Sequence, residues 1–265
     1  MNHFKDGIDF IIVSYYKPEY IHLLIKSIRK YVDYTYLITI VANEKQDSTE
    51  YKELIETYEN DDDVNVIDGT SQESFADRGG MAGVKWEHVY HDGEIWQFGP
   101  GSVNHSKGLT LGMKNTDQKY ICFLDNDVVF LDKWTDDILP ALKDSFVISH
   151  RFDRDKGPYG IIREMFMIFK RKSFESVNLY PDCTYVDGAG NITKHIIDNN
   201  KQFLILDNSL HNKSLKEKHV LNLSGGEQAF IGDRPFFYHY GRGSSRSDNM
   251  YNKWVTEVTK YLEKK

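Results

Sequence analysis

Short apolar runs alternate with amphipathic segments through the first quarter of the chain. The apolar runs are nearly continuous and rich in β-branched residues, which is typical of strands buried on both faces of a sheet. These runs are residues 8–13, 36–41 and 64–67. The segments between them carry apolar side chains at helical spacing and are residues 18–31 and 49–58. Pro18 and Ser48 stand where helices begin, so the pattern predicts an α/β fold with a doubly wound sheet.

The alternation resumes after a long irregular segment, residues 68–101. That segment contains seven glycines and clustered aromatic residues, and an irregular stretch of this length is usually functional in a compact domain. Its aromatic side chains are expected either to pack over the sheet or to stack on a bound ligand. Further helices are predicted at residues 103–115, 132–142, 191–200 and 247–262, and further strands at residues 120–124, 146–149, 164–170 and 203–206. The apolar stripe of the last helix indicates packing or dimerisation.

The composition limits the class of protein. A chain of 265 residues with 40% hydrophobic and 28% charged residues is ordinary for one large globular domain. The formal net charge of −7 gives no general basic surface, so nucleic acid is not an expected partner, although a local groove could be basic. Cys122 lies in an apolar strand and Cys183 in a polar loop, so no disulfide framework is expected. The first ten residues lack a signal peptide and no apolar run approaches about 20 residues, which predicts a cytoplasmic protein without a transmembrane segment.

The segment KYICFLDNDVVF, residues 119–130, ends an apolar strand on Asp125 and Asp127 and then returns to apolar residues. In open α/β sheets, ligands bind beyond the carboxyl ends of the strands. Two nearby carboxylates supply the hard oxygen ligands that suit Mg²⁺ or Mn²⁺. The alternative is an Asp-Asn turn without a ligand. Placement at a buried strand end favours the metal site, because acids there are costly unless they have a partner.

The wider segment NHSKGLTLGMKNTDQKYICFLDNDVVFLDKW, residues 104–134, resembles the central motif of GT-A glycosyltransferases, particularly family-2-like enzymes. Other segments resemble later and earlier parts of that family in the same order; they are DFIIVSYYKPEYIHLLIKSI, REMFMIFKRKSF, YVDGAGNITKHI and FFYHYGRGSS. The resemblance implies a single Rossmann-like mixed sheet within residues 1–246. Residues 1–130 would form the nucleotide-sugar-binding half, residues 131–246 the acceptor-side half, and residues 247–265 a C-terminal helix.

The resemblance also implies residue roles. Asp127 would bind Mn²⁺ or Mg²⁺ with help from Asp125, and His239 would be a further metal or diphosphate contact, unless it is a half-buried strand histidine. The other residues expected to bind the nucleotide-sugar donor are Ser14, Tyr15, Asn43, His105, Lys107, Asn126 and Arg242. The chain departs from the family after its second strand, where relatives carry Val-Asp-Asn and this chain has Val41-Ala42-Asn43. Asn43 or Glu44 would stand in for the missing acid, so the base is left open.

For catalysis, the resemblance points to Asp187 as the base that activates the acceptor hydroxyl, with inversion at the anomeric carbon. Asp187 would also serve as a helix N-cap, and Glu227 is the alternative base. The expected acceptor is a glycan, a lipid-linked sugar or another hydroxyl compound. A nucleotidyltransferase is a competing interpretation, but residues 14–18 lack the glycine-rich loop that such an enzyme needs. A non-catalytic nucleotide-sugar-binding protein is the other alternative.

Overall fold

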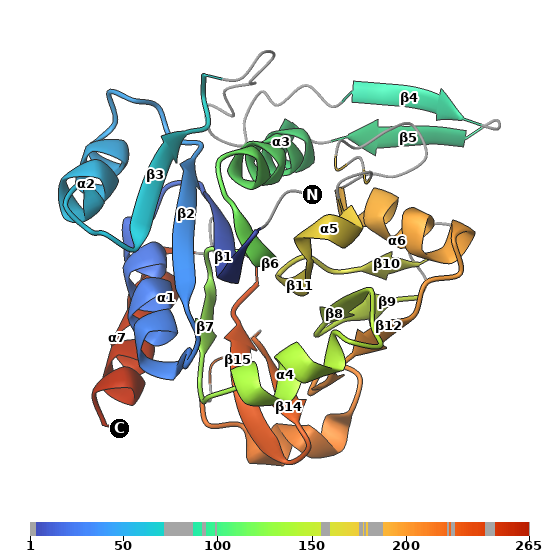
Figure 1. Cartoon of the computed structure of the whole chain (residues 1–265). Coiled ribbons are helices and arrows are strands. Elements are labelled where there is room, and N and C mark those ends of the chain that lie inside the picture. The colour runs from blue at the N-terminus through green and yellow to red at the C-terminus, as the bar shows by residue number, and fades with distance from the viewer. Residues whose placement is uncertain are drawn as a thin grey trace.

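A computed structural model describes residues 4–71, 87–91, 94–98, 100–154, 160–174, 177, 179, 188–221, 223, 226–241 and 247–264. Its central seven-stranded sheet has the order β12-β8-β11-β6-β1-β2-β3 (Figure 1). These strands are β1 (Lys5–Ser14), β2 (Tyr36–Ala42), β3 (Val64–Asp68), β6 (Gln118–Leu124), β8 (Val147–Ser149), β11 (Phe166–Lys170) and β12 (Phe203–Ile205). Neighbouring strands are parallel except where β11 takes part. The predicted doubly wound mixed sheet is therefore confirmed.

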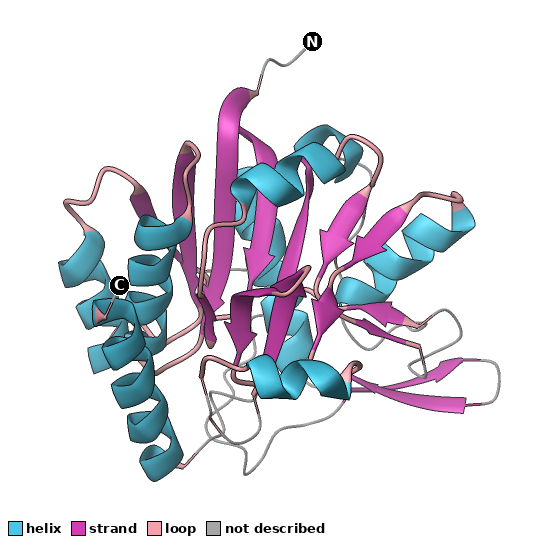
Figure 2. Ribbon diagram, turned by 90° about the horizontal axis from the view of Figure 1, so that it is seen from below, coloured by secondary structure: helices cyan, strands magenta, loops and turns pink. Residues whose placement is uncertain are grey.

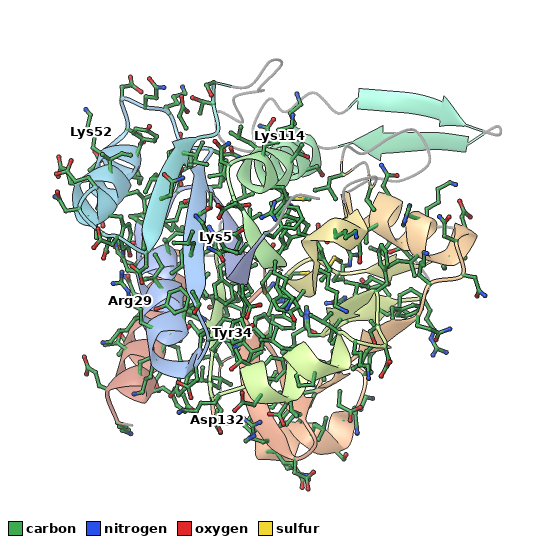
Figure 3. The ribbon with its side chains drawn as sticks, viewed as in Figure 1. Lys5, Arg29, Tyr34, Lys52, Lys114 and Asp132 are labelled. Carbon is green, nitrogen blue, oxygen red and sulfur yellow. The ribbon has the colours of Figure 1, made fainter. Side chains whose placement is uncertain are left out.

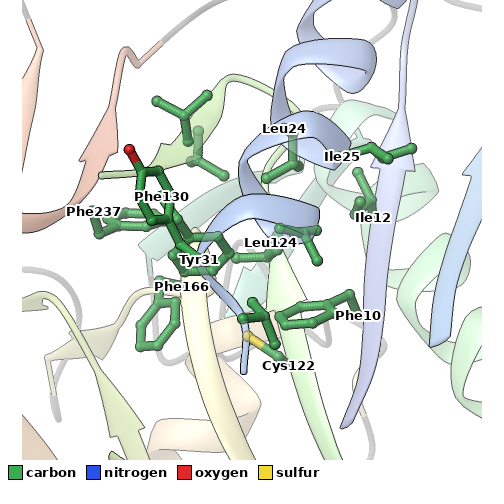
Figure 4. Close-up of a cluster of buried hydrophobic side chains, with 14 of the residues drawn as sticks. Phe10, Ile12, Leu24, Ile25, Tyr31, Cys122, Leu124, Phe130, Phe166 and Phe237 are labelled. Carbon is green, nitrogen blue, oxygen red and sulfur yellow. The ribbon is translucent and has the colours of Figure 1, made fainter. Parts of the chain in front are cut away.

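Helices cover both faces of this sheet (Figure 2). The helices are α1 (Pro18–Tyr31), α2 (Thr49–Tyr58), α3 (Pro100–Lys114), α4 (Thr135–Ala141), α5 (Arg171–Phe174), α6 (Gly188–Asp198) and α7 (Asp248–Glu263). Alternate residues of β1 divide the core in two, as expected for a strand buried on both faces. Phe10 and Ile12 join the cluster under α1 and α7, whereas Ile11 and Val13 join the cluster under α3 and α6. Figure 4 shows the first cluster, in which Cys122 lies buried among aromatic and aliphatic side chains.

A second, four-stranded sheet was not predicted from the sequence. It has the order β13-β14-β15-β7, and its strands are β7 (Val128–Phe130), β13 (Asp207–Asn208), β14 (Glu227–Ile231) and β15 (Arg234–His239). Three residues separate β6 from β7, so the chain leaves one sheet at Leu124 and enters the other at Val128. The two apolar runs around the paired aspartates therefore belong to different sheets, and the polar residues form the crossing.

The remaining short elements are the hairpins β4 (Glu87–His91) with β5 (Glu94–Phe98) and β9 (Phe152–Asp153) with β10 (Ile161–Ile162), and a 3-10 helix at Lys213–Lys218. The β4–β5 hairpin falls inside residues 68–101, for which the sequence showed no regular period. Both of its strands are described by their backbone alone, so whether its aromatic residues stack on a ligand stays a prediction.

Two glycines bring α3 against the carboxyl half of β1. A Cβ atom on Gly108 would lie 2.8 Å from Val13 Cγ2, and one on Gly112 would lie 2.4 Å from Ile11 Cγ2. Both distances are too short for packed carbon atoms, so residues without side chains are needed at these two positions. The first turns of α3, including His105, are thereby held at the sheet edge where β1 and β6 end.

At the opposite edge, a buried ion pair joins β1 to the end of β11. Asp9 and Arg171 are 0% and 6% exposed, and Arg171 Nη2 donates to Asp9 Oδ2 at 2.5 Å. The same guanidinium donates through Nε to Gln118 O at 2.7 Å and through Nη1 to Met113 O at 2.9 Å. The backbone N–H of Gln118 donates to Asp9 Oδ2 at 2.8 Å. This network fixes the start of β6 and the end of α3.

The C-terminal helix α7 packs on α1, which confirms the predicted packing. Dimerisation through this helix stays a prediction. Trp254 is fully buried, with its ring 4.7 Å from that of Tyr20, and Tyr261 Oη donates to Leu131 O at 2.9 Å. On the outer side of the helical layer, Arg29 and Lys52 project toward solvent (Figure 3). No helix in the described part of the chain is both long and apolar enough to cross a membrane.

Candidate active site

Asp125, Asp127 and His239 meet where the two sheets join. The aspartates follow β6, and His239 ends β15 opposite Val128 of β7. The backbone N–H of Tyr240 donates to the carbonyl oxygen of Asp127 at 3.0 Å. This hydrogen bond joins the crossing at residues 125–127 to the end of β15. His239 Nε2 lies 3.5 Å from Asp127 Oδ1 and 3.7 Å from Asp125 Oδ2. One ligand atom from each residue lies within 4.8 Å of the other two.

A carboxylate contacts the other side of the His239 ring. Glu227 Oε1 lies 3.0 Å from His239 Nδ1, 3.5 Å from His150 Nε2 and 3.2 Å from Arg151 Nη1. Glu227 and His239 are each 7% exposed and His150 is fully buried. The acids after β6 and Glu227 on β14 thus lie on opposite sides of one imidazole.

Helix α3 contributes a second histidine to the solvent side of the acids. His105 Nε2 lies 3.6 Å from Asp125 Oδ1, and His105 Nδ1 lies 3.7 Å from Glu164 Oε1. Asp125 has 30% of its side chain exposed, whereas Asp127 has 4%. His105 therefore lies beside the more accessible of the two acids, and its place near the donor stays a prediction.

The charges of this cluster shift several pKa values. Burial alone lowers the pKa of His239, but the negative charges of Asp127, Glu227 and Asp125 outweigh it and raise that pKa to about 9. Burial would raise the pKa of Glu227, yet His150 and His239 hold it below its usual range. Burial lowers the pKa of His150, which favours its neutral form. Among the described residues, the cluster holds more carboxylates than cationic groups, so it favours an added positive charge.

The donor set suits a divalent cation. Two carboxylates and one imidazole are ligands that Mn²⁺ accepts, and carboxylates also suit Mg²⁺. Histidines that bind metals commonly donate their second ring N–H to a carboxylate, as the Glu227 contact allows here. The residues predicted from the sequence to bind metal, Asp125, Asp127 and His239, are thus brought together in a fitting arrangement.

The ends of β1 and β2 form the neighbouring part of the site. Ser14 Oγ and the backbone N–H of Tyr16 both donate to Glu44 Oε1, the latter at 2.7 Å. Tyr16 and Lys17 have φ angles of 50° and 66°, a left-handed turn that this buried carboxylate holds in place. Asn43 Nδ2 donates to Asn104 O at 3.3 Å, and among the described residues its buried Oδ1 has no hydrogen-bond partner. Glu44 Oε2 is likewise buried without a hydrogen-bond partner among the described residues, so Asn43 and Glu44 each have an acceptor atom left for a ligand.

The remaining predicted residues divide into two groups. Tyr15, Lys107 and Asn126 lie respectively on the turn after β1, on α3 and between the paired aspartates, all at the carboxyl edge of the sheet. Asp187 and Arg242 lie outside the described residues. The positions of His150, Arg151 and Glu164 in this cluster were not predicted from the sequence. His150 and Arg151 directly follow β8, so their position after a strand end was the signal that could have found them.

A pocket of about 650 Å³ lies further along the sheet, where β8 and β12 end. Phe152 and Phe203 form one wall, with ring centroids 5.6 Å apart, and Ile205 and Leu206 add aliphatic surface. Arg151 also lines the pocket and donates to Glu227, so one side chain touches both the pocket and the acid–histidine cluster. Its volume lies in the range of small-molecule sites, and the rest of its lining is charged or polar, with Asp153, Arg154 and Asp207 among these residues.

Known structures provide the comparison for this arrangement. The chain is similar to the apo form of the glycosyltransferase GlyE from Streptococcus pneumoniae TIGR4, with a TM-score of 0.52 and 10% identity over 98% of this chain and 63% of that one. The chain has a glycosyltransferase fold of the GT-A type. No protein-family profile matches the sequence, and no curated protein matches it.

Two further solved structures match with lower TM-scores. TarS residues 1–349 from S. aureus gives a TM-score of 0.49 at 12% identity, covering 96% of this chain and 71% of that one. The mannosyltransferase PcManGT from Pyrobaculum calidifontis, in complex with GDP-Man and Mn²⁺, gives 0.47 at 14% identity, covering 76% and 55%. This chain therefore spans between 55% and 71% of the length of these three structures.

Proposed function

We propose that this chain is a glycosyltransferase that moves a sugar from a nucleotide-sugar donor to a hydroxyl acceptor and depends on Mn²⁺ or Mg²⁺. One observation carries the proposal: Asp125, Asp127 and His239 converge beside the ends of β1 and β2. In open α/β sheets this edge is where ligands bind. The fold shared with GlyE supports the same conclusion.

The residues of the cluster would divide the work on the diphosphate. Asp125, Asp127 and His239 would hold the cation, which neutralises the negative charge that develops on the departing diphosphate. Asn126, His105 and Lys107 would contact the diphosphate or donor sugar from the crossing and from α3. Arg242, outside the described residues, is proposed to clamp phosphate oxygens, because a guanidinium binds them with two parallel hydrogen bonds.

The nucleoside would lie over the ends of β1 and β2. The turn at Ser14 and Tyr15 would line the ribose and base, and Glu44 Oε1 would hold that turn. Asn43 Oδ1, buried without a partner among the described residues, would accept a hydrogen bond from the base. An amide in place of a carboxylate leaves the identity of the base open.

The acceptor would enter from the side of β8 and β12. The pocket lined by Phe152 and Phe203 offers aromatic faces for a sugar ring, and Arg151 connects it to the cluster. Asp187 is proposed as the base that removes the acceptor proton, which would give inversion. Glu227 suits that role less well, because it is 7% exposed and contacts His239 and Arg151.

The proposal is tested by thermal unfolding of the full chain with UDP-, GDP-, CMP- and dTDP-sugars, each with and without Mn²⁺. One donor is expected to raise the Tm in the presence of Mn²⁺, because a ligand that binds the folded state stabilises it. Asp127→Ala should abolish that metal-dependent rise. Asp187→Asn should preserve the rise and stop sugar transfer. If no nucleotide sugar stabilises the protein with Mn²⁺, the glycosyltransferase proposal is wrong.

A further inference from the structure

The strand register places Glu227 directly opposite His239. β14 and β15 are antiparallel, and Glu227 and His239 are paired residues in their ladder. Directly opposed residues of two strands point to the same face of a sheet, so the contact is built into the register rather than made by a mobile loop. Glu227 Oε1 lies 3.0 Å from His239 Nδ1, which is hydrogen-bonding distance.

This contact decides which ring nitrogen of His239 is available. An ionised carboxylate only accepts hydrogen bonds, so Nδ1 must carry a proton to bond Glu227. In a neutral imidazole the other nitrogen, Nε2, then holds the free electron pair. Nε2 is the atom that lies 3.5 Å from Asp127 and 3.7 Å from Asp125. The tautomer selected by Glu227 is therefore the one that can bind a cation held by the two aspartates.

A network of Arg151, Asp153 and Arg163 holds the Glu227 carboxylate in place. Arg151 Nη1 donates to Glu227 Oε1 at 3.2 Å, and the same guanidinium donates through Nε to Asp153 Oδ1 at 2.6 Å and through Nη2 to Asp153 Oδ2 at 3.2 Å. Arg163 Nε donates to Asp153 Oδ2 at 2.7 Å. These two arginines fix Asp153, which fixes Arg151 against Glu227. The positive charge of Arg151 also opposes a second cation bound between Glu227 and His150.

We propose that Glu227 is a positioning residue, which orients His239 and selects its Nδ1–H tautomer so that Nε2 can bind the divalent cation. It acts through His239 and touches neither donor nor acceptor. This inference rests on the proposed function, because it assumes that Asp125, Asp127 and His239 bind the cation. It assigns Glu227 a different role from that of a catalytic base.

The test measures Mn²⁺ binding alone, by electron paramagnetic resonance of free Mn²⁺ titrated with the metal-free full-length protein. Glu227→Gln is expected to weaken Mn²⁺ binding by about 10- to 100-fold, which is typical for loss of such an outer carboxylate. Glu53→Gln is the matched control, since Glu53 Oε1 also lies 3.0 Å from a histidine nitrogen, but that histidine is His22 instead of His239. This control should bind Mn²⁺ as tightly as the wild type.

A double-mutant cycle separates positioning from a general effect of charge. If Glu227 acts through His239, adding Glu227→Gln to His239→Ala should cause no further loss of Mn²⁺ affinity. An equal loss in both backgrounds would show that Glu227 acts by its charge alone and would overturn the proposal. Glu227→Asp, which keeps the charge but moves the carboxylate back by one methylene, provides a second variant if Glu227→Gln fails to fold. It should also weaken Mn²⁺ binding.

The outcomes distinguish this inference from the function on which it rests. If the wild type binds Mn²⁺ and Glu227→Gln binds it equally well, the positioning role is wrong and the glycosyltransferase proposal stands. If the wild type binds no Mn²⁺ but a nucleotide sugar still raises its Tm, the metal site and the role of Glu227 fail together while donor binding survives.

Discussion

The central sheet buries carboxylates both at the edge where its strands begin and at the edge where they end, but the charge is balanced in different ways at the two edges. At the edge where β6 begins, Asp9 faces Arg171, and backbone groups of Gln118 complete the network. At the edge where β6 ends, Asp125, Asp127 and Glu227 surround His239. The first network is balanced by the protein itself. The second, as far as the structure describes its residues, carries an excess of negative charge.

This difference indicates which network serves the fold and which serves a ligand. A buried ion pair that satisfies its own hydrogen bonds ties strands together and needs nothing further. A buried group of like charges costs stability, and proteins keep such groups where a ligand or metal supplies the missing charge. The same residue type therefore has opposite meanings at the two edges of one sheet.

The largest expected effect is at the balanced edge. Arg171→Met should lower the free energy of unfolding by about 3–5 kcal/mol, because it leaves the Asp9 carboxylate buried without its partner. Urea unfolding followed by circular dichroism measures the change. Asp9→Asn combined with Arg171→Met should recover part of the loss, since the unpaired charge is then gone. Mn²⁺ affinity of the folded fraction should match that of the wild type.

The next effect is at the unbalanced edge and concerns binding rather than folding. Asp127→Asn should weaken Mn²⁺ binding by about 100-fold or more, because one of the two charged ligands of the cation is lost. The free energy of unfolding of the metal-free variant should stay within about 1 kcal/mol of the wild type, because the change also relieves repulsion between carboxylates. Calorimetric titration and urea unfolding measure the two quantities. A large loss of stability without a loss of Mn²⁺ binding would make Asp127 a structural residue like Asp9.

The pH dependence of the metal-free protein offers a smaller effect. The folded state raises the pKa of His239 from its ordinary 6.5 to about 9, because Asp127, Asp125 and Glu227 favour its charged form over the opposing effect of burial. Protonated His239 therefore stabilises the folded state below about pH 6.5, and this contribution is lost as the pH rises through about 9. Urea unfolding across that range should show declining stability. His239→Gln should flatten the decline, and an unchanged profile would contradict the assigned charge.

The smallest effect is expected for a third charged group, at the surface. Arg29 Nη2 lies 2.9 Å from Asp61 Oδ1 and 2.8 Å from Asp63 Oδ1, but 40% of the arginine side chain is exposed. Arg29→Gln should change the free energy of unfolding by less than about 1 kcal/mol, because water and salt screen exposed ion pairs. Urea unfolding at low and high salt measures it. A loss as large as that for Arg171→Met would show that burial does not explain the comparison.

The sequence predicted the central sheet well because its signals are local. The strand at residues 36–41 is observed as Tyr36–Ala42 and the helix at residues 18–31 as Pro18–Tyr31, since hydrophobic periodicity and Pro18 act within each segment. The second sheet was missed because β7 has three residues and pairs with β15, more than a hundred residues later. Short strands of that kind carry no clear period of their own.

The candidate site was predicted in part for the same reason. Asp125 and Asp127 follow an apolar strand and could be recognised from their neighbours in the sequence. The place of Glu227 depends on the register between β14 and β15, and that of Arg151 on the end of β8. Neither relation is visible without the fold. The roles of Asp187 and Arg242 remain predictions.

The crossing from β6 to β7 has a mechanical consequence. Because residues 125–127 join one sheet to the other, and His239 reaches them from the far side of that junction, a cation held there would fasten the two sheets to each other. Loading the protein with Mg²⁺ should then slow amide hydrogen exchange in β7 and β15 while leaving the amides of β2 and β3 unaffected. Metal occupancy would then determine how rigidly β7 and β15 are held, as well as the net charge at the crossing.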